Sequence, residues 1–126
     1  MIRSAFIKSL LELLTNDDPD CSMLQKQFLF LSEFDHAFTG SGSFISFSHE
    51  EDIKTYRIFR SSKVITGIKI RSAELTADAD AVLYINNGLI EHLEIHSEDG
   101  NYPETELTNY ELLQAWKVAA NKVVQS

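Results

Sequence analysis

One stretch of the sequence decides the fold class: Ala81-Val82-Leu83-Tyr84-Ile85-Asn86-Asn87-Gly88-Leu89-Ile90-Glu91-His92-Leu93-Glu94-Ile95-His96. Two apolar runs flank Asn87-Gly88. Asn and Gly tolerate the positive φ angles that a two-residue turn between antiparallel strands requires. The stretch therefore predicts a β-hairpin.

Patterns upstream of the hairpin add further strands. Gly40–Ser43 predicts a turn, because it is rich in glycine and serine, and Phe44–Ser48 that follows alternates like a strand. Thr55–Phe59 and Val64–Leu75 are additional strand candidates. The run Phe28–Leu31 is apolar without a period, so it could close a helix or open a strand.

Helices are predicted before these strands. A three- and four-residue spacing of apolar side chains predicts an amphipathic helix close to the first residue. Asn16–Asp20 ends it, because Asp and Asn compete for their own backbone and Pro19 disfavours helical angles at Asp18. A second helix is expected to start near Asp20 or Ser22. The apolar positions of the first helix are Ile2, Phe6, Leu10, Leu13 and Leu14.

The last part of the chain predicts a helix as well. Thr108 and Glu111 have the spacing of a capping box, in which each side chain satisfies an amide near the other residue. The apolar face of this predicted helix consists of Leu112, Leu113, Trp116, Ala119, Ala120 and Val123.

Helices at both ends with a run of strands between them indicate an α+β domain. We expect a central antiparallel β-sheet with the N-terminal helices and the C-terminal helix packed on one face. The length of 126 residues fits a single domain over 1–126.

Composition excludes several classes of protein. Nineteen acidic against eleven basic residues give a net charge of −8, which argues against binding a nucleic-acid backbone by charge. No uncharged apolar run approaches the roughly 20 residues of a membrane-spanning helix. Cys21 is the only cysteine, so no internal disulfide forms, and we expect a cytoplasmic protein.

The charge is distributed unevenly along the chain. Ile53–Ala73 contains six basic residues and no acid, whereas ten of the nineteen acids lie between Ser72 and Trp116, where no Lys or Arg occurs. These two segments could neutralise each other across neighbouring strands. Alternatively, the acids could form an exposed patch that steers a basic protein partner. The candidate partner-binding residues are Glu91, Glu94, Glu98, Asp99, Glu104 and Glu106.

A second candidate site lies on the second strand of the hairpin. His92, Glu94 and His96 alternate, so they project from one face of a regular strand. Imidazole and carboxylate groups are common zinc or iron ligands, which makes these residues weak candidates for a metal site. A solvated polar face explains the same pattern, and we expect no cofactor.

No other motif indicates catalysis. Gly40-Ser41-Gly42 precedes a strand instead of a helix and has no Lys-Ser or Lys-Thr after it, so it predicts a turn and not a phosphate loop. Asp35 and His36 could begin an acid/base pair, but a polar strand end explains them equally. Cys21 has no catalytic motif around it. We therefore expect a protein that is not an enzyme.

The order of motifs resembles a known group. Phe38-Thr39-Gly40-Ser41-Gly42-Ser43-Phe44-Ile45-Ser46-Phe47, the hairpin from Ala81 to Glu94 and the later Pro103 are similar to small uncharacterised bacterial proteins of the kind found among polymorphic-toxin immunity proteins. The resemblance covers about the middle half of the chain, and its motifs are structural. It implies a protein that neutralises a toxin by occlusion, without catalytic residues.

Two functions of different classes follow. The first is an acidic protein-binding module with a basic partner, in the manner of an immunity protein. The second is a small-ligand or metal-binding protein that uses His92, Glu94 and His96. A homodimer whose sheet faces meet is compatible with either.

Overall fold

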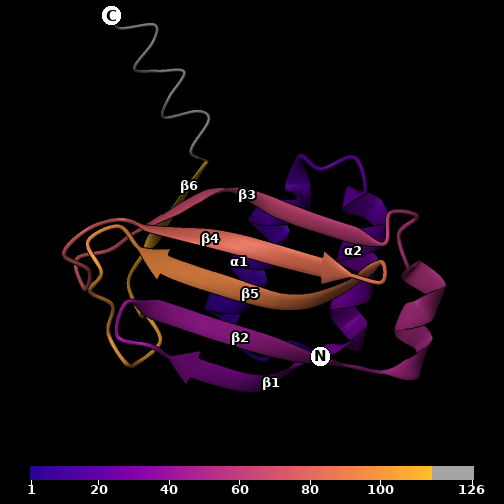
Figure 1. The fold of residues 1–126 in the computed structure, drawn as a ribbon, viewed down its shortest axis with the longest axis horizontal. Coiled ribbons are helices and arrows are strands. Elements are labelled where there is room, and N and C mark those ends of the chain that lie inside the picture. The colour runs from indigo at the N-terminus through magenta and orange to yellow at the C-terminus, as the bar shows by residue number, and fades with distance from the viewer. Residues whose placement is uncertain (115–126) are drawn as a thin grey trace, which may run out of the picture.

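The structure is a computed structural model that describes residues 1–114. It is an α+β fold with a six-stranded antiparallel sheet and a few helices (Figure 1). The helices are α1 (Ala5–Asn16), α2 (Cys21–Gln27) and the short 3-10 helices η1 (Phe28–Phe30) and η2 (Glu51–Tyr56). The strands are β1 (Leu31–Phe38), β2 (Gly42–His49), β3 (Ser62–Arg71), β4 (Ala79–Asn86), β5 (Leu89–Ser97) and β6 (Glu111–Gln114).

The strand order in the sheet is β1-β2-β5-β4-β3-β6. β1 and β2 form one hairpin, and β4 and β5 form another. The chain crosses between them after β2, through η2, and returns as β3 on the far side of β4. β1 and β6 are therefore the two edges of the sheet.

The β4–β5 hairpin confirms the prediction from Asn87-Gly88. Both turn residues have positive φ, 54° at Asn87 and 75° at Gly88. The segment before β3 is fastened to this turn, because the Ile58 amide donates to the Gly88 carbonyl and the Gly88 amide donates to the Ser61 carbonyl, each at 3.0 Å. A Cβ at Gly88 would lie 2.6 Å from the Ile58 carbonyl oxygen, so the contact itself requires glycine.

The two predicted N-terminal helices are present, and they contact the middle of the sheet. The Ser4 hydroxyl caps α1 by accepting from the Ile7 amide at 3.1 Å. α1 packs against β3 and β4, and α2 packs against β5. Figure 1 looks onto the sheet with both helices behind it. The core lies between these layers, where Leu10, Leu11 and Leu24 are fully buried.

One strand prediction is wrong, and one run that the sequence left open is resolved. Thr55–Phe59 is not a strand: Glu51–Tyr56 forms η2, whose buried Ile53 anchors the crossover to the core. Phe28–Leu31, left open by the sequence, divides between η1 and the first residue of β1. β1 itself continues to Phe38, although its polar Glu33, Asp35 and His36 conceal the strand.

The C-terminal helix prediction is wrong where the structure describes it. Residues 111–114 are the strand β6, with Leu112 opposite Ile70 of β3. The expected capping box does not form, because the amides of Thr108 and Asn109 donate instead to the Glu74 carboxylate, each at 2.9 Å. Tertiary bonds thus replace the local cap. The rest of the predicted helix, with Trp116, Ala119, Ala120 and Val123, lies outside the described residues.

Within residues 1–114, none of the helices combines the length and the apolar composition needed to cross a bilayer.

Candidate functional site

The candidate partner-binding carboxylates occupy β5 and the connection that follows it. Glu91 and Glu94 lie on β5, where the buried residues Leu93 and Ile95 alternate with His92, Glu94 and His96. The other four follow the end of β5, in the connection to β6, at the opposite end of the strand from the Asn87-Gly88 turn. They are Glu98, Asp99, Glu104 and Glu106.

Two cations of β3 neutralise part of this acidic region. Lys69 bridges Asp80 at 3.2 Å and also contacts Glu98. Arg71 forms a two-pronged pair with Asp78, with its Nη2 at 2.9 Å and its Nε at 3.1 Å. The hydrogen bond from Arg71 lowers the pKa of Asp78, and the bond to Glu98 raises the pKa of Lys69. Internal neutralisation therefore applies to Asp78, Asp80 and Glu98.

Asp99 is held by neutral groups instead. Its carboxylate accepts from the Ser97 hydroxyl at 2.7 Å, from the Asn101 amide at 3.0 Å and from the Thr76 hydroxyl. These bonds, the one from Thr76 first, lower the pKa of Asp99 to about 2. The side chain therefore remains negatively charged at neutral pH, with no cation to cancel it among residues 1–114.

Glu104 and Glu106 are exposed on the same connection. Glu106 accepts a hydrogen bond from the Ser4 hydroxyl at the start of α1. Glu104 has neither a hydrogen bond nor an ion pair to any residue within 1–114. Because a bond to a neutral hydroxyl leaves a carboxylate charged, both side chains contribute to the negative field of this surface. We call Asp99, Glu104 and Glu106 the acidic loop surface.

The His92, Glu94 and His96 side chains share a face of β5, as their alternation predicts, but they are engaged differently. The His92 ring lies between Phe44 and Tyr84, with ring centroids 4.5 and 4.3 Å away. Glu94 accepts from the Tyr84 hydroxyl at 3.2 Å. Over the described part of the chain, no three His, Cys, Asp or Glu residues are grouped closely enough to hold a metal ion. His92 and Glu94 are thus part of a cross-strand aromatic cluster.

The remaining sequence candidates are dispersed. Gly40-Ser41-Gly42 forms the turn into β2, Cys21 begins α2, and Asp35 and His36 are neighbours in β1. His36 stacks on Phe38 with centroids 4.3 Å apart, and its Nε2 is buried without a hydrogen-bond partner in residues 1–114. Burial lowers the pKa of His36 despite the nearby carboxylates.

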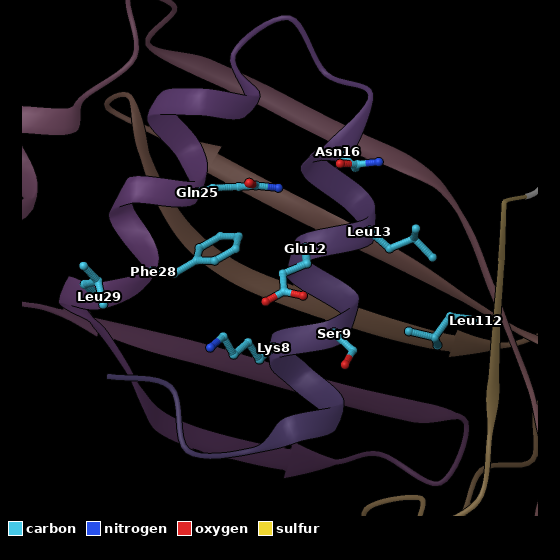
Figure 2. A pocket seen from close by; sticks show the side chains of 9 residues that line it. All are labelled: Lys8, Ser9, Glu12, Leu13, Asn16, Gln25, Phe28, Leu29 and Leu112. Carbon is cyan, nitrogen blue, oxygen red and sulfur yellow. The ribbon is translucent and has the colours of Figure 1, made fainter.

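Sequence reasoning missed a groove between α1 and α2, shown in Figure 2. Gln25 and Phe28 point toward α1 from one side, and Lys8 and Glu12, one helical turn apart, belong to the other side. Its volume is about 690 Å³, and Leu29 beside it is 61% exposed. No motif in the sequence marks the groove. The full lining consists of Lys8, Ser9, Glu12, Leu13, Asn16, Gln25, Phe28, Leu29 and Leu112.

Comparison with known proteins identifies no relative of this chain. No protein-family model, no curated protein and no solved structure matches this chain.

Proposed function

We propose that this protein is a non-enzymatic, acidic protein-binding module that captures a basic partner, and that it acts as an immunity protein which neutralises a toxin by occlusion. The resemblance in the sequence suggests the class. The distribution of charge supports the mode of binding.

One observation carries the proposal: the acidic loop surface is not neutralised from within. Between residues 69 and 111 the chain has ten carboxylates and two cations, Lys69 and Arg71. Those two cations pair with Asp78, Asp80 and Glu98. Asp99 and Glu106 bond to neutral donors, so their charges remain available to attract a partner. Uncancelled charge of one sign raises association rates with a partner of the opposite sign.

A basic nuclease is the partner chemistry that fits best. An enzyme that binds nucleic acid presents clustered cations, and an acidic protein can cover them in place of the phosphate backbone. The lone Cys21 is compatible with a reducing compartment, so we place this protein in the cytoplasm, where such a toxin would act. Neither nucleic acid nor a membrane is part of the proposal.

The test is co-expression with the product of the gene immediately upstream in the source genome. We expect that product to arrest growth when induced alone, and growth to recover when this chain is co-expressed. The two proteins should elute together as a stoichiometric complex in size-exclusion chromatography, because occlusion consumes one inhibitor for each toxin. A neighbour that is not toxic, or a toxic neighbour without rescue, would contradict the proposal.

Two other results would also contradict it. Rescue at substoichiometric levels, without a complex, would indicate an enzyme. Stoichiometric zinc or iron in the purified protein, lost in a His92→Ala/His96→Ala variant, would favour the ligand-binding alternative at His92, Glu94 and His96.

A further inference from the structure

The outer edge of β1 is open in the described structure. β1 is bonded to β2 on one side, and no segment of residues 1–114 pairs with its other side. Figure 1 shows β1 as the lowest strand of the sheet, with no strand beyond it. The strand is eight residues long. Unpaired backbone groups along such an edge are a template for an added strand.

This edge lacks most of the usual protection against pairing. Exposed edges are commonly blocked by lysine, proline or a bulge. β1, with the sequence Leu-Ser-Glu-Phe-Asp-His-Ala-Phe, contains no Lys, Arg or Pro. It has one irregularity in register, between Glu33 and Asp35. The residue inside that irregularity, Phe34, is 78% exposed and offers an apolar contact to an incoming chain.

A hollow of about 590 Å³ lies beside the same strand. Glu33, His36 and Phe38 of β1 line it, together with Glu106 of the acidic loop surface. Arg3 and Ser4 also line it, and their backbone amides donate to the Glu33 carboxylate, each at 2.9 Å. The buried Nε2 of His36 has no hydrogen-bond partner in residues 1–114. An added strand would direct every second side chain to this side of the sheet, because cross-strand neighbours share a face. A long basic side chain there could approach the Glu106 carboxylate.

We infer that the outer edge of β1 binds an extended, basic segment of the partner protein as a seventh strand of the sheet. The basic character of the segment rests on the proposed function and agrees with the charge of the edge. The exposed Asp35 would face a lysine or arginine side chain, while Phe34 would be covered by an apolar residue.

The charge of β1 also argues against a second copy of this chain as the occupant. Pairing β1 with β1 of another molecule would bring Glu33 and Asp35 of both copies, four carboxylates, into one strand pair. Like charges opposite each other destabilise a sheet. A basic strand removes that repulsion.

The experiment uses two synthetic eight-residue peptides, one alternating Lys and Val and one alternating Glu and Val. Backbone NMR signals and amide exchange of the full chain are followed during titration. We expect the Lys-Val peptide to shift the signals of residues 31–38 and slow their amide exchange, and the Glu-Val peptide to have no effect. Phe34→Lys should weaken binding of the Lys-Val peptide about tenfold, because it removes the apolar contact and adds a like charge.

Phe59→Lys is the matched control, since Phe59 is also an exposed phenylalanine, 105% accessible, but lies outside the sheet edge. It should leave the Lys-Val affinity unchanged. The inference would be overturned if the Lys-Val peptide shifted only the NMR signals of the acidic loop surface. It would also be overturned if the original chain and Phe34→Lys bound the Lys-Val peptide with equal affinity. Slow exchange of β1 amides that depends on protein concentration without peptide would instead identify a second copy as the occupant.

The inference and the proposed function can fail separately. If Phe34→Lys still rescues growth and forms the complex with the toxin, the toxin does not use β1, and the proposed function stands. If the upstream product is not toxic but the Lys-Val peptide binds β1, the strand-addition site stands without the immunity role.

Discussion

At the scale of single residues, Gln27 has a structural role that no pattern in the sequence indicates. Its side chain is fully buried at the end of α2. Its Nε2 donates to the carbonyls of Tyr56 at 2.8 Å and Gly88 at 3.0 Å, and its Oε1 accepts from the Ile90 amide at 2.9 Å. One amide group therefore joins α2 to η2 and to the β4–β5 hairpin.

Replacement of the Gln27 side-chain amide should lower the stability of the fold. In Gln27→Leu, the Tyr56 carbonyl and the Ile90 amide lose this partner inside the protein, and each unsatisfied group costs roughly 1 to 3 kcal/mol. The Gly88 carbonyl keeps its bond from the Ile58 amide. We expect the free energy of unfolding, measured by urea denaturation, to fall by about 3 kcal/mol. Gln25→Leu on the same helix is the control, because Gln25 makes a single bond, to the Thr15 hydroxyl at 3.2 Å. Equal losses in the two variants would show that the Gln27 bonds are not important.

At the scale of elements, the turn after β5 is bonded to two other connections at the same end of the sheet, the β1–β2 turn and the segment between β3 and β4. The Ser97 amide donates to the Ser41 carbonyl at 2.8 Å, and the Tyr102 amide donates to the Gly40 carbonyl at 2.9 Å. The Glu98 amide donates to the Asp78 carbonyl at 3.0 Å. Asp99 organises this turn through its bonds to Ser97, Asn101 and Thr76, so the acidic loop surface has a defined shape.

The depressed pKa of Asp99 gives the turn a dependence on pH. The folded-state pKa is about 2, against 3.8 for an unperturbed aspartate. The stabilisation is complete above pH 3.8 and is lost as the pH falls toward about 2, because the unfolded chain takes up the proton first. We expect the melting temperature of Asp99→Asn to depend less on pH over this interval than that of the original chain. Glu104→Gln, which removes an exposed carboxylate without these bonds, should retain the original slope. An unchanged slope in Asp99→Asn would contradict this assignment.

At the scale of the whole molecule, charge separates along the sheet. Lys69 and Arg71 pair with part of the acidic region, while Glu104 and Glu106 lie on the connection after β5 and form no ion pair within residues 1–114. The remaining field extends about one Debye length, roughly 10 Å at 0.1 M salt, which is enough to orient an approaching basic protein.

The rate of association with the partner should therefore depend on the position at which carboxylates are removed. We expect Glu104→Gln/Glu106→Gln to reduce the association rate with the upstream-encoded toxin severalfold at low salt, and to weaken its salt dependence. Glu50→Gln/Asp52→Asn removes the same charge from the crossover beside η2 and should have a smaller effect. Stopped-flow measurement at several salt concentrations distinguishes them. Equal effects of the two variants would show that net charge, and not the acidic loop surface, governs association.

Local patterns predicted the elements whose geometry is local. Asn87-Gly88 predicted the hairpin because Asn and Gly tolerate the positive φ angles that the turn requires. The spacing from Phe6 to Leu14 predicted α1 because it places apolar side chains on one face of a helix. The shared face of His92, Glu94 and His96 also followed from strand alternation. What these side chains contact could not be predicted, because Phe44 and Tyr84 reach His92 from other strands.

By itself, the sequence determined the α+β class, the hairpin at its centre and the unequal distribution of charge along the chain. Only the tertiary structure decided that residues 111–114 pair with β3 in place of forming a helix, and there Glu74, distant in the chain, accepts the Thr108 amide that the predicted capping box would have satisfied. It also decided which carboxylates meet Lys69 and Arg71 and which keep their charge. Such pairings depend on distances between segments far apart in the sequence, and no local pattern contains them.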